Sequence, residues 1–210
     1  GHTVDVPLLP GHGTELNDLR GMVWDDWASA SQLAMDELAS RSGPVVVGGI
    51  GMGAALACWV AAMHAEVVGL IVVNPRAVPV PQEALDMLQA MLADGAEYVP
   101  PLAPDVSDRS ARIVGYETVP VATLISMFEA INGMADHWGE IRCPVLVVTS
   151  GRDHRVSPYN AEFLSEHVDG PVERMVLERS FHAATVDVEH EELERAAVAF
   201  VEKVMASQPS

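Results

Sequence analysis

The chain has 210 residues, of which 49% are apolar and 20% charged, a balance typical of one or at most two compact globular domains. Thirty acidic residues against twelve basic ones give a formal net charge of -18 at pH 7. Such a surface repels phosphate backbones and anionic lipid headgroups, so nucleic acid is not expected as a partner.

Neither a membrane span nor a disulfide framework is indicated. Apolar runs such as residues 67–73 fall far short of the roughly 20 residues that a membrane span needs. No basic stretch precedes an apolar one at the N-terminus, as it would in a signal peptide. The two cysteines, Cys58 and Cys143, both lie beside apolar residues, which favours buried free thiols. We therefore expect a cytoplasmic protein.

The N-terminal part predicts alternating strands and helices. A short strand is expected at residues 3–8, followed by a Pro-Gly-His-Gly turn at 10–13. Apolar residues at helical spacing, with acids in the first turn, predict a helix at 24–39. The β-branched run at 44–47 predicts a strand buried on both faces, and the glycines after it lead into a helix at 52–64.

The same alternation continues, because buried strands are expected at residues 67–73, 145–149 and 172–177. Such spacing requires crossover connections and predicts an α/β fold, with a mostly parallel sheet and helices on both faces. Ligands bind such sheets beyond the carboxyl ends of the strands. Residues 78–139 break the pattern. They hold two helix-like pieces, 82–93 and 121–132, and a proline-rich loop, and they are interpreted as an insertion covering the sheet.

A glycine-rich turn joins the strand at 44–47 to its helix, with the sequence GGIGMGA at residues 48–54. Small residues at 49 and 53 permit the close approach of strand and helix that a nucleophile elbow requires. The central residue of an elbow is a serine in serine hydrolases, whereas here it is Gly51. Taken alone, this turn is equally consistent with phosphate binding or with plain packing.

Two later loops favour a nucleophile elbow over phosphate binding or packing at residues 48–54. Asp153 follows the strand at 145–149, and His182 follows the strand at 172–177. The chain order of elbow, Asp and His is that of the α/β-hydrolase triad.

The chain resembles the bacterial carboxylesterase and monoacylglycerol lipase group of the α/β-hydrolase fold. The residues that carry the resemblance are 9–14, Trp24, Asp26 with Trp27, 49–53, 143–147, 151–154 and 180–182. The resemblance implies a hydrolase core at 1–77 and 140–210, with a helical cap at 78–139. It places the nucleophile at Gly51, the acid at Asp153, the base at His182 and one oxyanion donor at the Met52 N–H. It implies no metal and no cofactor.

The sequence departs from the family pattern in two ways. The serine is absent, and the chain begins where the family's fourth strand begins, without the His-Gly loop that supplies the second oxyanion donor. The resemblance places residues 3–8 one strand away from residues 44–49, so the sheet is expected to have a gap. We expect an upstream segment or a second copy of the chain to fill this gap, or residues 3–8 to pair directly with residues 45–47.

Each candidate residue also has a purely structural interpretation. Asp153 could cap its loop, and His182 could be an ordinary loop histidine facing solvent. His154 is interpreted as a structural neighbour and His12 as a residue that shapes its turn. Cys58 is expected to pack in its helix and not to replace the nucleophile. Ser150 is a weaker candidate still. Apolar cap residues could line an acyl pocket or simply form a core; they are Leu88, Met91, Met127 and Phe128.

The sequence thus predicts a carboxylesterase or lipase scaffold for short or medium acyl esters. It is expected to be nearly inactive, because loss of a triad member costs about 10⁴ to 10⁶ in turnover in a serine protease. The alternatives are a ligand-binding or interaction protein on the same fold and, less favoured, a lyase that uses the Asp-His pair as a base.

Overall fold

The computed structural model describes residues 1–208. Its helices, with 3-10 helices marked η, are α1 (Leu16–Leu19), α2 (Trp24–Ser42), α3 (Met52–Met63), α4 (Gln82–Ala93), α5 (Val121–Met134), η1 (Ala135–Glu140), α6 (Tyr159–His167), η2 (Ala184–Val186) and α7 (His190–Ala206). Its strands are β1 (Val45–Ile50), β2 (Val67–Val73), β3 (Val145–Ser150) and β4 (Val172–Leu177).

The four strands form one parallel sheet in the order β1-β2-β3-β4. Helix α3 connects β1 to β2, and α6 connects β3 to β4, as a parallel sheet requires. The connection from β2 to β3 contains α4 and α5. All the carboxyl ends therefore lie at one edge of the sheet, and the α/β prediction is confirmed.

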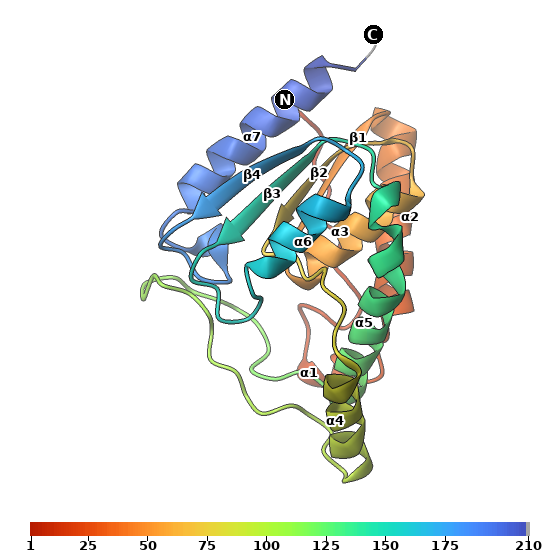
Figure 1. Ribbon diagram of the computed structural model, residues 1–210, viewed down its shortest axis with the longest axis vertical. Helices are drawn as coiled ribbons and strands as arrows, with labels where there is room; N and C mark the ends of the chain where they lie inside the picture. Colours follow the sequence, from red (N-terminus) through yellow and green to blue (C-terminus); the bar gives the residue numbers. More distant parts are fainter. Residues whose placement is uncertain (209–210) are drawn as a thin grey trace.

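Helices cover both faces of the sheet, and α7 lies on the face opposite α3 and α6 (Figure 1). Every residue of β3 is buried, and its side chains alternate between two apolar clusters. Val145 and Val147 pack in the cluster that holds residues of α2, α3 and α6. Leu146 and Val148 pack with Phe200 of α7. β3 and most of β2 are thus buried, as their sequence predicts. The expectation of a buried strand is wrong for β4, which ends the sheet and exposes Glu173, Arg174 and Val176, and it holds only in part for β1.

The expected strand at residues 3–8 is wrong. The segment has no regular structure and is exposed, with Val4 79% and Val6 84% accessible. Pro7 lacks the N–H that a strand would donate, and no described strand pairs with this segment. It runs beside β1 across a groove of about 270 Å³, so it does not pair with residues 45–47 either. Filling of this edge by another segment or by a second copy of the chain stays a prediction.

The segment between β2 and β3 has two packing environments. Leu88 of α4 and Val121 and Ile125 of α5 form a small apolar cluster of their own. The far end of α5 belongs to the main core, where Ile131 packs together with Trp138 of η1. In Figure 1, α4 lies beyond the carboxyl edge of the sheet, and α5 leads from it back toward α2. Helix α5 thus links the outlying α4 to the body of the protein.

Candidate active site

The turn between β1 and α3 has the geometry of a nucleophile elbow. Gly51, directly before α3, has φ 56° and ψ -115°, a conformation that side chains rarely adopt. Its N–H donates to the Val73 carbonyl at 3.0 Å, which fixes the turn to the end of β2. A Cβ on Gly49 would lie 2.1 Å from the Gly53 carbonyl oxygen, so strand and helix approach too closely for any other residue at 49. The close packing therefore requires glycine at 49, whereas Gly51 occupies the centre of the turn, where the sequence predicts the nucleophile position.

His182 lies directly over Gly51. A Cβ built on Gly51 would be 3.0 Å from Nε2 and 3.2 Å from Cε1 of the imidazole. The ring thus presents Nε2 to the place where a nucleophile's side chain would begin. The structure brings these two predicted site residues together.

Asp153 fixes the orientation of this imidazole. Its Oδ2 lies 2.7 Å from His182 Nδ1, and its side chain is only 1% exposed. Its Oδ1 accepts the N–H groups of Arg155 at 2.6 Å and Val156 at 2.8 Å. Burial alone would raise the Asp153 pKa, but the hydrogen bonds from His182 and the backbone outweigh it, and the pKa is lowered. An ionised Asp153 can only accept, so Nδ1 carries a proton, and in the neutral ring Nε2 is left as the acceptor that faces Gly51.

Asn74, which sequence reasoning missed, supports the histidine loop from β2. It has a positive φ of 47°, uncommon for a residue other than glycine. Its Nδ2 donates to the His182 carbonyl at 2.9 Å and to Ser150 Oγ at 3.0 Å, and its Oδ1 accepts the Ser150 N–H at 2.7 Å. One buried amide therefore joins the ends of β2 and β3 to the histidine loop. An Asn at a strand end was the only signal in the sequence.

Asp105, also missed, joins the segment between α4 and α5 to the loops that carry Asp153 and His182. Its side chain accepts the N–H groups of His154 at 2.9 Å and His182 at 3.2 Å, and it pairs with His154 Nδ1 at 2.7 Å. Its carbonyl accepts the Ala183 N–H at 3.0 Å. His154 is thus a structural neighbour of the site, as predicted. Nothing in the local sequence marks Asp105, whose partners are far along the chain.

A buried carboxylate behind the histidine loop was missed as well. Asp187, fully buried, accepts backbone N–H groups from Phe181, Ser107 and Asp108 at 2.7 to 2.9 Å. Burial raises its pKa, but these bonds and that of Val188 outweigh burial, so the net pKa is lowered. Asp187 thereby fastens residues 107–108 to the loop that carries His182.

The N-terminal turn is shaped as expected, and it involves His12. His12 Nδ1 lies 3.2 Å from the Pro10 carbonyl, which also accepts the Trp27 indole N–H at 2.9 Å. The two rings meet edge to face. Tyr116 donates its hydroxyl to the Gly11 carbonyl at 3.0 Å, so this turn also contacts the segment between β2 and β3.

The remaining candidates lie at different depths. Met52 is the first residue of α3, where an N–H has no acceptor within the helix, and its role as an oxyanion donor stays a prediction. Cys58 is 1% exposed within α3, and burial raises the pKa of its thiol, so it packs rather than reacts. Burial also raises the pKa of Cys143, to about 11. Both cysteines are free, as predicted. Ser150 is buried against Asn74.

The four expected acyl-pocket residues divide between two clusters. Leu88, Met91 and Phe128 belong to the small cluster between α4 and α5, whereas Met127 packs against the main core. Phe128 also lies beneath the Arg76 guanidinium, with Cζ 5.2 Å from the ring centre. Their role in substrate binding stays a prediction.

Neither a metal cluster nor a membrane-spanning helix is found in residues 1–208. No group of three or more His, Cys, Asp or Glu side chains there could hold a metal ion. None of the described helices is long and apolar enough to cross a membrane.

Comparison with known proteins agrees with this geometry. Residues 1–196 match the alpha/beta hydrolase family. The chain is 28% identical over 188 residues to the thermostable monoacylglycerol lipase of Bacillus sp. (strain H-257), covering 89% of this chain and 74% of that enzyme.

Solved structures show the same fold. A structure from the work on LipS and LipT, two metagenome-derived lipolytic enzymes, superposes with a TM-score of 0.85 at 27% identity, covering 93% of this chain and 80% of the other. The Saccharomyces cerevisiae monoglyceride lipase superposes with a TM-score of 0.76 at 11% identity, covering 93% and 75% of the two chains, and supports the fold alone. The chain belongs to the alpha/beta hydrolase family, in its esterase and lipase group.

Proposed function

We propose that this protein binds short or medium acyl esters at Gly51 and His182 and hydrolyses them very slowly or not at all. The observation that carries the proposal is the 3.0 Å between His182 Nε2 and the Cβ position of Gly51. The base and its carboxylate are aligned on a residue that has no hydroxyl. An ester carbonyl bound beside His182 would find no nucleophile, because no acyl-enzyme can form on Gly51.

The residues that remain support one chemical step. A water held between Gly51 and His182 would give its proton to Nε2, and the resulting hydroxide would attack the ester carbonyl carbon. The Met52 N–H would hold the developing oxyanion, and collapse would expel the alcohol, which takes the proton back from His182. Asp153 would stabilise the transient imidazolium. Without a positioned nucleophile, turnover is expected to fall by about 10⁴ to 10⁶ relative to a complete triad.

The relatives support an acyl ester as the ligand. The Bacillus protein is a monoacylglycerol lipase, and the metagenomic proteins are lipolytic. We propose residues 78–139 as the cap, with Leu88, Met91, Met127 and Phe128 contacting the acyl chain. If turnover is absent altogether, the protein is a non-catalytic ligand-binding or interaction protein on the same fold, an alternative that Gly51 itself favours.

Titration of the unmodified protein with 1-monooctanoylglycerol tests the proposal. We expect saturable heat in calorimetry and shifts of the Gly51 and Met52 amide resonances in NMR, while chromatography detects little or no octanoate. Binding with no product above the buffer rate favours the non-catalytic alternative, and slow product that disappears in His182→Gln favours the water mechanism. Absence of heat and of amide shifts would contradict ester binding.

A further inference from the structure

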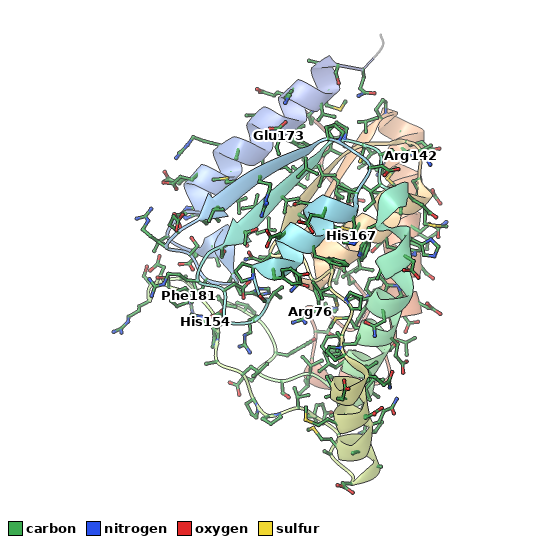
Figure 2. All side chains as sticks on the ribbon, in the orientation of Figure 1. Arg76, Arg142, His154, His167, Glu173 and Phe181 are labelled. Atoms are coloured by element: carbon green, nitrogen blue, oxygen red, sulfur yellow. The ribbon has the colours of Figure 1, made fainter. Side chains whose placement is uncertain are left out.

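Arg76 lies near the triad and has no assigned task in ester hydrolysis. It follows β2 by three residues, and Figure 2 shows it between α6 and the α4–α5 segment, at the same end of the sheet as His154 and Phe181. The residue is half-buried. Its Nη2 donates to the Arg155 carbonyl at 3.0 Å, and its Cζ lies 5.2 Å from the centre of the Phe128 ring.

The guanidinium of Arg76 is incompletely paired. Arginine has five N–H donors, and within residues 1–208 this one forms a single hydrogen bond to protein and no salt bridge. Burial lowers its pKa, and the charge of Asp153 counteracts this only in part. The oxygens of Asp153 are already occupied by His182 Nδ1 and by two backbone N–H groups. The remaining N–H groups of this half-buried guanidinium are therefore available to an anionic ligand.

Two further arginines flank Asp153 in the adjacent loop. The Cζ of Arg152 lies 5.0 Å from the centre of the Phe181 ring, and the Nη2 of Arg155 donates a hydrogen bond to the Ala103 carbonyl. Neither forms a salt bridge with a described residue. In a chain with only twelve Lys and Arg residues and a net charge of -18, three arginines that lack a salt bridge in the described part of the chain lie close to Asp153. This end of the sheet is thus suited to an anionic ligand.

We propose that Arg76 binds a carboxylate group of the ligand and makes the protein selective for acyl compounds that carry one. The inference rests on the proposed function, because the acyl part of the ligand would occupy the site beside Gly51. A guanidinium supported on one side by Phe128 and Arg155 keeps N–H groups for a carboxylate, which it can bind in bidentate form. The carboxylate could be that of a free fatty acid or the free end of a dicarboxylic half-ester.

Calorimetry with three ligands of similar length tests this selectivity: methyl octanoate, which is neutral, octanoate, and monomethyl suberate. We expect both carboxylates to bind the unmodified protein more tightly than methyl octanoate does. Arg76→Gln should weaken the carboxylates at least about tenfold while leaving methyl octanoate within about twofold. Arg41→Gln is the matched control, since it removes the same charge from an exposed position on α2 and should change none of the three affinities.

The outcomes separate this inference from the proposed function. An Arg76-dependent effect on octanoate alone supports a fatty acid as ligand, and one on monomethyl suberate alone supports a half-ester. If Arg76→Gln weakens the binding of all three ligands equally, the inference is overturned, and Arg76 has only a structural role between α5 and the Asp153 loop. Binding of methyl octanoate with no preference for carboxylates would overturn it while ester binding stands, and absence of all binding would contradict both. If Arg76→Gln unfolds, Arg76→Lys, which keeps the charge but not the bidentate geometry, should retain only part of the preference, and full retention would count against the inference.

Discussion

Replacement of Gly51 by serine should create an esterase. The new Cβ would lie 3.0 Å from His182 Nε2 and 3.2 Å from Cε1, so the imidazole must retreat by a few tenths of an ångström. After this adjustment the hydroxyl lies within hydrogen-bonding reach of Nε2, and the nucleophile has its base. The positive φ of 56° is strained for serine, and we expect a loss of about 1 to 2 kcal/mol in the free energy of unfolding.

The size of the gain follows from the restored nucleophile. Restoring a triad member is worth about 10⁴ to 10⁶ in turnover. The variant and the unmodified protein have the same oxyanion donors, so the donors cancel in the comparison. We therefore expect hydrolysis of p-nitrophenyl butyrate, measured by release of p-nitrophenolate, to rise by at least about 10⁴-fold over the unmodified protein.

Gly51→Ala is the matched control, because it introduces the same Cβ and the same strain without a hydroxyl. Both variants should unfold at similar temperatures, and only the serine variant should gain activity. If a folded Gly51→Ser variant hydrolyses the ester no faster than Gly51→Ala, the assignment of residue 51 as the nucleophile position is refuted.

Three further predictions concern the elements around the site. Asp187→Asn should lower the free energy of unfolding by about 3 kcal/mol in urea titrations near pH 7. Both carboxylate oxygens accept backbone N–H groups, and in asparagine one of them is replaced by an NH₂ group, which cannot accept a hydrogen bond. Since the folded-state pKa of Asp187 is lowered, its stabilisation is complete above the ordinary value of 3.8 and is lost as the pH falls through the lowered pKa; an Asn variant with unchanged acid sensitivity would contradict this. Asp105→Ala should speed proteolysis between residues 94 and 120, seen by mass spectrometry, because the bonds to His154 and His182 disappear; unchanged cleavage would show that these bonds do not hold the segment. Along β1, the N–H groups alternate between the β2 side and the outer edge, since Val45 donates to Glu66, just before β2, and Gly51 donates to Val73. Val47 and Gly49 should therefore exchange their amide protons more slowly than Val46 and Gly48, and uniformly slow exchange would mean that the outer edge is occupied.

The regular elements could be predicted because each carries its own local pattern. The β-branched run of β2 matched its predicted bounds, since strands buried on two faces need continuous apolar residues. The bounds of β4 were matched too, although β4 is the last strand of the sheet and exposes Glu173 and Arg174. Residues 3–8 have a similar local pattern, but a strand also needs a neighbouring strand with which to form hydrogen bonds. Pro7 has no backbone N–H to donate to such a neighbour. Pairing is a long-range property that a single segment does not encode.

The same distinction applies to the site. The proximity of Gly51, Asp153 and His182 could be predicted, because short motifs surround each of them. Asn74 and Asp105 could not, because they are single polar residues whose partners lie far away in the chain, 108 residues for Asn74 and His182. Their hydrogen bonds exist only after folding has brought together the strand ends and the segment between β2 and β3.

Covalent labelling tests most directly whether residue 51 is aligned with the Asp153–His182 pair. Intact-mass spectrometry after reaction with an alkyl fluorophosphonate should show one adduct on Gly51→Ser, mapped to residue 51, and none on the unmodified protein. Combining Gly51→Ser with His182→Gln should slow the labelling at least about 100-fold, because the general base is lost while the hydroxyl remains. Equal labelling rates with and without His182, or an adduct at a residue other than 51, would contradict a triad geometry that lacks only its nucleophile.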